Sequence, residues 1–251
     1  MKTDIFHIVY FDYDRSCYIH FYNCNFRCLG CLRKISIWDC HLQEDDIKIC
    51  KFKDFLSLKD LEIILQKLKA DSDLEKVVLG GGEPTTDKKF LEIISLLKEF
   101  DLKITLLTNG FSFPQGFDKF RDIKVTVSIK SIDPQKHYFY TGHSLSPILE
   151  NIKNLVEKGF EVLIETIYIP GFNEVDEILK IEDFIFSIDE KIPLIVDSFL
   201  PVPGVPWRRP SLEELENLEA ELVKRDIKNV YLRGKTIITG IRGNVCLIFP
   251  I

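Results

Sequence analysis

The chain has 251 residues, with 33 basic and 39 acidic side chains and a formal net charge of −6. Its length suffices for one α/β domain with a full core, and the mixture of charges argues against nucleic acid as a primary partner. No signal-peptide pattern opens the chain, and no apolar run reaches the ~18 residues of a membrane span. Seven cysteines, three of them crowded together, suit a reducing compartment and metal ligation. We therefore expect a cytoplasmic protein with no membrane partner.

A strand is expected at residues 16–22, where β-branched and aromatic side chains predominate. It leads into Cys24, Cys28 and Cys31, which are separated by three and then by two residues. Thiolates at this spacing can hold three irons of a cubane cluster and leave the fourth iron open for chemistry. A zinc site and inert buried thiols are the alternatives, and zinc is disfavoured because no second pair of ligands follows.

Residues 32–55 show irregular, polar signals. Within them Trp38, Asp39, Cys40 and His41 could be extra ligands, but a lone Cys–His pair is more often packing or surface, so no second cluster is predicted. Leucine and isoleucine then recur at helical spacing from residue 58 to residue 68, behind Ser57 as N-cap. The first helix is expected there.

A short apolar strand at residues 76–79 runs into Gly81, Gly82 and Glu83, and a helix follows at residues 90–97. A phosphate cradle does not fit, because no Lys-Ser/Thr pair follows and Glu83 would repel a phosphate. The glycines allow close approach to the backbone, and the carboxylate and carbonyls can take an ammonium group. The alternative is a plain turn in which Pro84 starts the helix.

The rest of the chain repeats the order of strand then helix. Strands are expected at residues 103–107, 124–129, 162–169 and 194–200, with helices starting near residues 134 and 147 and another across residues 178–185. The first three of these strands are followed, in turn, by Thr108, Asn109 and Gly110, by Lys130, and by Pro170 and Gly171.

Six strands in alternation with helices imply a parallel sheet with right-handed crossovers. Ligands collect at the C-terminal ends of such strands. The cysteine loop, the Glu83 loop and the three later groups each come directly after a predicted strand, so all of them should face one mouth. This placement is typical of an enzyme whose site is assembled from strand–helix loops.

The CxxxCxxC loop resembles that of the radical S-adenosylmethionine enzymes, although Gly30 stands where an aromatic residue is frequent. The resemblance implies an α/β fold, a partial (β/α)6 barrel with a short C-terminal extension. It also implies two cofactors, a four-iron, four-sulfur cluster and S-adenosylmethionine. By the same resemblance, Cys24, Cys28 and Cys31 would bind the cluster, and the cofactor contacts would be Gly81, Gly82, Glu83, Thr108, Asn109, Lys130, Ile169, Pro170 and Gly171.

Residues 133–155 and 169–173 are similar to the glycyl-radical-enzyme activases, notably the pyruvate formate-lyase activating enzyme. This likeness implies hydrogen abstraction from a glycine of a partner enzyme, with an electron donor of flavodoxin or ferredoxin type. Leu107 and Ser128 replace acidic residues that help that branch to bind a monovalent cation. Two alternatives stay open: radical modification of a small molecule or other peptide, as in deazaguanine synthase-like enzymes, and a non-catalytic metal-binding barrel.

The barrel is expected to occupy residues 1–200. Residues 201–251 are expected to form a proline-rich segment, a helix capped by Ser211, and short strands at 230–232 and 236–249, packed on the barrel. The proline-rich segment could pass over the site mouth or be a surface linker, and the linker is slightly favoured.

Overall fold

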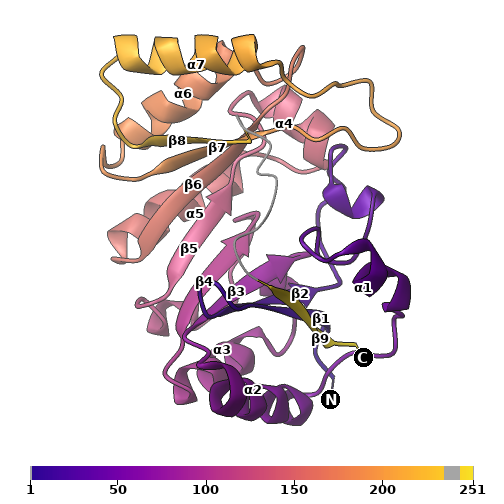
Figure 1. Ribbon diagram of the computed structural model, residues 1–251. Helices are drawn as coiled ribbons and strands as arrows, with labels where there is room; N and C mark the ends of the chain where they lie inside the picture. The colour runs from indigo at the N-terminus through magenta and orange to yellow at the C-terminus, as the bar shows by residue number, and fades with distance from the viewer. Residues whose placement is uncertain (1, 235–243, 251) are drawn as a thin grey trace.

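The computed structural model describes residues 2–234 and 244–250, which form one curved sheet with helices along its outer side (Figure 1). The sheet order is β8-β7-β6-β5-β4-β3-β2-β1-β9. The strands are β1 (Ile5–Phe11), β2 (Ser16–Phe21), β3 (Lys76–Gly81), β4 (Lys103–Thr108), β5 (Lys124–Ser128), β6 (Glu161–Tyr168), β7 (Leu194–Ser198), β8 (Val230–Arg233) and β9 (Val245–Phe249).

The helices start where the sequence supplies caps. Ser57 and Ser211 each form a capping box with the acidic residue three positions later, and Asp133 accepts from two backbone amides of the first turn that follows it. The α-helices are α1 (Glu44–Ile49), α2 (Leu58–Ser72), α3 (Phe90–Glu99), α4 (Pro134–Thr141), α5 (Ser146–Glu157), α6 (Val175–Phe186) and α7 (Leu212–Lys224). Three short 3-10 helices are η1 (Leu32–Lys34), η2 (Pro84–Thr86) and η3 (Phe117–Lys119).

All neighbouring strands from β2 to β8 run parallel, so the expectation of an α/β partial barrel is confirmed. The six predicted strands are β2 to β7, with ends that differ by at most two residues. The strand expected at 230–232 is β8, which continues the parallel part. Of the strand expected at 236–249, residues 236–243 lie outside the described residues.

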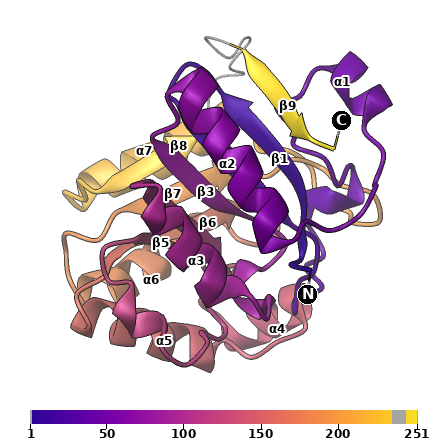
Figure 2. The same cartoon turned by 90° about the horizontal axis from the view of Figure 1, so that it is seen from below.

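One edge of the sheet was not foreseen from the sequence. β1 pairs antiparallel with β2, and β9 pairs antiparallel with β1 on the other side. β1 is buried along its whole length, so it lacks the alternation that marks a half-exposed strand. The pairing of β9 with β1 brings the C-terminal part of the chain next to its first strand, a contact that no local pattern encodes (Figure 2).

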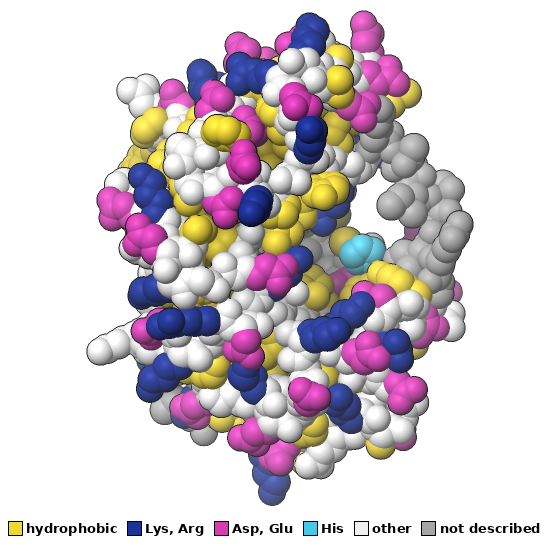
Figure 3. Space-filling model, turned by 90° about the vertical axis from the view of Figure 1, so that its left-hand side faces the viewer, with side chains coloured by type: hydrophobic (Ala, Val, Ile, Leu, Met, Phe, Trp, Pro, Cys, Tyr) yellow, Lys and Arg dark blue, Asp and Glu magenta, His cyan; other side chains and the backbone are white. Residues whose placement is uncertain are grey.

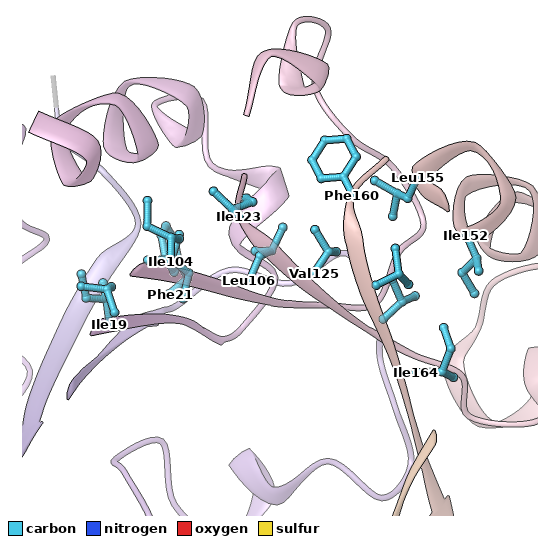
Figure 4. Packing of buried hydrophobic residues seen from close by; sticks show 14 of the residues in the cluster. Ile19, Phe21, Ile104, Leu106, Ile123, Val125, Ile152, Leu155, Phe160 and Ile164 are labelled. Atoms are coloured by element: carbon cyan, nitrogen blue, oxygen red, sulfur yellow. The ribbon is translucent and has the colours of Figure 1, made fainter. Parts of the chain in front are cut away.

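The main core lies between the sheet and its outer helices. Alternate strand residues point toward the helices, among them Ile19, Leu106, Val125 and Ile164, and they belong to one buried cluster with helix residues such as Ile152 of α5 (Figure 4). Each such side chain stabilises the fold by about 1.5–3 kcal/mol relative to an exposed one. The intervening strand residues therefore point away from the helices, toward the concave face.

The surface carries both signs of charge. On the face shown in Figure 3, lysine and arginine side chains are interspersed with acidic ones and with small apolar areas. No helix within residues 2–234 and 244–250 is long and apolar enough to cross a membrane.

Candidate functional site

The cysteine loop follows β2, as predicted. Cys24, Cys28 and Cys31 are all free thiols, and the backbone amide of Phe26 donates to Cys24 Sγ at 3.4 Å. Burial raises the pKa of the Cys28 thiol to about 11; the Lys130 ammonium lowers it, and the charges of Cys24 and Cys31 raise it. Because the charge of each thiolate would raise the pKa of its neighbours, three thiolates in this loop would need a cation in common. That requirement fits a metal cluster better than an empty set of thiols.

The cysteine loop is held against α4 by its backbone. The amides of Arg27 and Leu29 donate to the carbonyls of Thr141 and Tyr140, at 3.1 and 2.9 Å. Residues just past α4 add a second contact, because the His143 ring stacks on Phe26 with centroids 4.8 Å apart, and its Nε2 lies 2.8 Å from the Asn25 carbonyl. The positions of the sulfurs therefore depend on α4 as well as on β2.

Gly30 is explained by the same packing. A Cβ at this position would lie 2.2 Å from the hydroxyl oxygen of Tyr140 and 2.8 Å from a ring carbon of Phe199. Tyr140 is only 2% exposed and cannot easily move aside. An aromatic ring thus does lie beside the last cysteine, but α4 supplies it instead of residue 30.

The predicted glycine loop lies directly against the cysteine loop. The amide of Gly82 donates to the Phe21 carbonyl and that of Glu83 to the Asn23 carbonyl, both at 2.7 Å. A Cβ at residue 82 would come within 2.2 Å of the Asn23 carbonyl oxygen, so only glycine permits this approach. Gly81 has φ +86 and lies over the His20 ring. Two loops far apart in sequence are therefore joined by backbone bonds.

The Glu83 carboxylate is turned into the protein. Its Oε1 accepts from the Thr85 amide and from the hydroxyls of Thr85 and Thr108, and its Oε2 accepts from the Asn109 amide at 2.6 Å. Burial raises the pKa of Glu83, and these hydrogen bonds oppose that shift. Among the residues that the structure describes, Oε2 accepts only this one bond, so it retains the capacity for one further donor. In this structure the Glu83 carboxylate therefore connects the loop after β3 to the loop after β4.

The turn after β4 lies at the same edge of the sheet as the cysteine and glycine loops. We call this edge, formed by the C-terminal ends of the parallel strands, the rim. The turn consists of Thr108, Asn109 and Gly110. Asn109 Nδ2 donates to the side-chain oxygen of Asn25 at 2.6 Å, which links this turn to the cysteine loop. The Gly110 amide donates to Thr108 Oγ1, and Gly110 has φ +71. The β2, β3 and β4 loops therefore form one continuous hydrogen-bonded unit.

Lys130 follows β5 and begins a second group of polar residues. Its Nζ donates to Ser128 Oγ, which in turn donates to Glu165 Oε1 at 3.5 Å. Arg233 on β8 pairs with Glu165 at 2.9 Å and with Asp197 at 2.7 Å. Burial and the charge of Glu165 raise the pKa of Asp197, whereas Arg233 and Lys130 lower it. This charged group spans the ends of β5 to β8.

Glu165, Asp197 and Arg233 were not identified from the sequence. The available signal was a single charged residue within each of the mostly apolar strands expected at residues 162–169 and 194–200. Their convergence depends on strand register, since Ser128 aligns with Glu165 and Asp197 aligns with Arg233. Register between strands cannot be read from such patterns.

Ile169, Pro170 and Gly171 lie at the end of β6. Ile169 is fully buried in a small cluster with Tyr140 and Phe199, against which Cys28 packs. Gly171 has φ +77, and its amide donates to Glu174 Oε1 at 2.9 Å. This turn therefore contacts the same packing group as the cysteine loop.

The proline-rich segment packs onto this rim. The Trp207 ring lies 4.8 Å from the Phe172 ring and 5.7 Å from the Tyr140 ring, measured between centroids. Val202 is buried in the same cluster. The preference for a surface linker is therefore wrong for this part of the segment, because large apolar side chains hold it against α4 and the β6 turn.

Comparison with known proteins agrees with this geometry. The family model of the radical SAM superfamily matches residues 18–185. A protein of Methanocaldococcus jannaschii, provisionally named a glycyl-radical enzyme activating enzyme, is 31% identical over 177 residues, which cover 67% of this chain and 62% of that protein. A GTP 3',8-cyclase of Shewanella denitrificans is 29% identical over 61% of this chain and 44% of the cyclase. The chain thus spans less than two thirds of the length of these relatives.

Two solved structures share the fold. SuiB of Streptococcus suis, solved with S-adenosylmethionine bound, has a TM-score of 0.67 and 20% identity, covering 84% of this chain and 48% of SuiB. A domain of pyruvate-formate lyase-activating enzyme from Bacteroides vulgatus has a TM-score of 0.51 and 22% identity, covering 64% of this chain and 99% of that domain. Because the family model covers most of the chain and the parallel sheet carries the cysteine loop at its rim, this chain belongs to the radical SAM superfamily, whose enzymes use an iron–sulfur cluster and S-adenosylmethionine.

Proposed function

We propose that this chain cleaves S-adenosylmethionine reductively and uses the resulting radical to abstract a hydrogen atom. Cys24, Cys28 and Cys31 would hold a four-iron, four-sulfur cluster by three of its irons. When bound together, the cluster and S-adenosylmethionine supply one-electron cleavage of the sulfonium to a deoxyadenosyl radical. The electron would come from a flavodoxin- or ferredoxin-type donor.

The residues of the chain bind and orient these groups. The carbonyls of Gly81 and Gly82, together with the free capacity of Glu83 Oε2, would accept from the amino group of S-adenosylmethionine. Thr108, Asn109 and Lys130 would contact its ribose or carboxylate, and Ile169, Pro170 and Gly171 its adenine. The buried cluster around Ile169 would exclude water from the part of S-adenosylmethionine that reacts.

One observation carries this proposal. The cysteine loop, the glycine loop and the Asn109 turn are joined by hydrogen bonds between 2.6 and 2.7 Å, although more than eighty residues separate the first from the last. Such a unit would set the sulfurs at a fixed place relative to the glycine loop and the Asn109 turn. Pre-organisation of that kind is what a reaction between two bound groups requires.

For the substrate, we propose a glycine of a partner glycyl-radical enzyme. The archaeal relative's name and the activase domain among the structural matches support this choice. Leu107 and Ser128, which replace the acidic residues of that branch, weigh against it. The second candidate is radical chemistry on a small molecule or another peptide, which the identity to the GTP 3',8-cyclase favours.

Anaerobic reconstitution with iron and sulfide, followed by reduction with dithionite, tests the first step. We expect about four irons per chain and formation of 5′-deoxyadenosine from S-adenosylmethionine. A variant with alanine at residues 24, 28 and 31 should show neither, while Cys246→Ala, which alters an exposed thiol on β9, should behave like the wild type. A wild-type protein that binds no iron would leave the non-catalytic barrel as the explanation.

Electron paramagnetic resonance separates the two substrate classes. The reduced protein is mixed with S-adenosylmethionine and a candidate glycyl-radical enzyme. A glycyl radical doublet that depends on all three components supports the activase. Steady 5′-deoxyadenosine formation without that signal, together with a modified small molecule or peptide in mass spectra, supports the second candidate.

A further inference from the structure

A second group of metal-binding side chains lies outside the cysteine loop. Asp39, Cys40 and His41 lie between η1 and α1, and each offers one ligand atom within 4.8 Å of the other two. The cysteine loop docks on α4 and the β4 turn, whereas this segment is bound to His7 of β1 and His20 of β2. The cysteine loop and the Asp39–His41 group are therefore held by different parts of the fold.

Two of the three separations between the ligand atoms are close to those around a tetrahedral ion, and the third is within 4.8 Å. Cys40 Sγ lies 3.7 Å from His41 Nδ1, and His41 Nδ1 lies 2.9 Å from Asp39 Oδ1. Zinc bonds of about 2.3 Å to sulfur and about 2.0 Å to nitrogen and oxygen separate these pairs by about 3.6 and about 3.3 Å at tetrahedral angles. Only small side-chain rotations are needed to match them, and Cys40 and His41 are exposed enough to rotate.

Asp39, the carboxylate of this group, is oriented by hydrogen bonds to two buried histidines. Asp39 is 3% exposed, its Oδ2 lies 2.8 Å from His20 Nε2, and its backbone amide donates to His7 Nε2 at 3.2 Å. His7 Nδ1 lies 2.8 Å from the Phe249 carbonyl, so that nitrogen carries the proton and Nε2 is free to accept. Buried partners that orient a ligand in this way are a regular feature of metal sites.

His20 joins this group to the glycine loop. Its ring stacks on Tyr18 with centroids 4.2 Å apart, and the Tyr18 hydroxyl accepts from the Gly81 amide at 3.1 Å. The Asp39 carboxylate is thus connected through two buried or half-buried rings to the proposed S-adenosylmethionine site.

We propose that Asp39 Oδ1, Cys40 Sγ and His41 Nδ1 bind one zinc ion. One thiolate, one imidazole and one carboxylate are a ligand set for a borderline divalent ion, and zinc is commonly bound by such groups. Binding displaces two protons, that of the Cys40 thiol and the one that His41 Nδ1 shares with Asp39 Oδ1, and both are released to solvent. With three protein ligands the fourth position is open to water or to a soft donor such as a thiol, as in zinc sites that handle a ligand. This proposal does not depend on the proposed radical function.

The test uses the full chain with its iron–sulfur cluster reconstituted. The protein receives one equivalent of zinc chloride, is desalted, and is analysed for zinc content and by zinc X-ray absorption. We expect about one zinc per chain, with one sulfur neighbour at about 2.3 Å and nitrogen or oxygen neighbours at about 2.0 Å. In Cys40→Ser and His41→Ala the zinc affinity should fall by about 100-fold or more, and in His20→Phe by about tenfold.

Cys246→Ser is the matched control, since Cys246 is an exposed thiol on β9, and it should retain the zinc. Iron content and the unfolding midpoint show whether each variant is folded; both substituted ligands are exposed, so neither measurement should change. Equal zinc retention by wild type and Cys40→Ser would overturn the proposal. So would two or more sulfur neighbours, because these would place the ion on the cysteine loop.

Discussion

The two halves of the strand-end rim are held together by different forces. From β2 to β4, backbone hydrogen bonds and buried side chains join the loops, and glycines at residues 30 and 82 allow the contacts. From β5 to β8, partly exposed ion pairs around Arg233 join the strands. Backbone bonds in a buried setting fix geometry, whereas exposed ion pairs contribute little and rearrange readily. The first half is thus suited to fixing the cysteine loop and the glycine loop. In the second half, Lys130 and the Ile169 turn belong to the proposed S-adenosylmethionine site, and the ion pairs around Arg233 are the part suited to adapting to a substrate.

The largest loss of stability should come from adding a side chain at residue 82, where the glycine loop contacts the cysteine loop. In Gly82→Ala the new methyl group would meet the Asn23 carbonyl oxygen at 2.2 Å, and neither backbone can yield without breaking its bonds. We expect a loss of about 3 kcal/mol or more in unfolding free energy and loss of bound iron. Urea unfolding and iron analysis measure both.

Gly159→Ala is the matched control for this substitution. Its methyl group would meet no atom within 4 Å, but its φ of +81 is unfavourable for alanine. Its cost should be about 1 kcal/mol, and its iron content should not change. If both variants lose iron equally, the tight approach of the loops is not what holds the site.

The next effect concerns Gly30 and the ring beside it. Gly30→Ala should cost about 1–3 kcal/mol through its clash with the Tyr140 hydroxyl and Phe199. Tyr140→Phe removes the nearest atom, so the double variant should recover part of that loss. A double-mutant cycle in urea measures the coupling, and additive losses would show that Tyr140 does not constrain residue 30.

The contrast between the halves also explains which features could be predicted from the sequence and which could not. The positions of Cys24, Glu83 and Lys130 just after strands were predicted correctly because strand and loop are neighbours in the chain, and their roles stay predictions. Even so, the inward turn of the Glu83 carboxylate depends on Thr108 and Asn109 of the next strand. Arg233 and the pairing of β9 with β1 escaped prediction because both depend on register between distant segments.

A third prediction concerns acid and the packing beneath the cysteine loop. His137 of α4 is fully buried, and neither ring nitrogen has a hydrogen-bond partner of standard geometry among the described residues. Burial lowers the pKa of His137 to about 4, so the unfolded chain takes up a proton as pH falls below 6.5 and the folded chain does not. The stability contributed by this neutral ring is complete above pH 6.5 and declines toward pH 4.

His137→Phe removes that proton uptake. Relative to wild type, the variant should gain about 2 kcal/mol between pH 7.5 and pH 5. Its stability at pH 7.5 should match or exceed that of wild type, since an unpaired polar group has been removed from the core. Urea unfolding at the two pH values measures the gain, and parallel pH dependence of the two proteins would contradict the assignment of a neutral buried ring.

The smallest effect on stability is expected in the second half, from Arg233→Met. Arg233 is about half exposed, so its loss should cost no more than about 1 kcal/mol. The pKa of Asp197, already raised by burial and by Glu165, should rise further without its cation. Ionisation of Asp197 is then less favourable in the folded state, so the loss should be larger at pH 8 than at pH 5.

Lys124→Met provides the comparison for Arg233→Met. Lys124 pairs with Glu161 at 3.0 Å at the opposite ends of β5 and β6, far along the strands from the rim. If the second half handles substrate, Arg233→Met should reduce substrate turnover and leave 5′-deoxyadenosine formation without substrate within about twofold of wild type, while Lys124→Met changes neither. Equal loss of both reactions in Arg233→Met would mean that Arg233, like Lys130 in the proposed site, serves S-adenosylmethionine, and its assignment to the substrate would then be wrong.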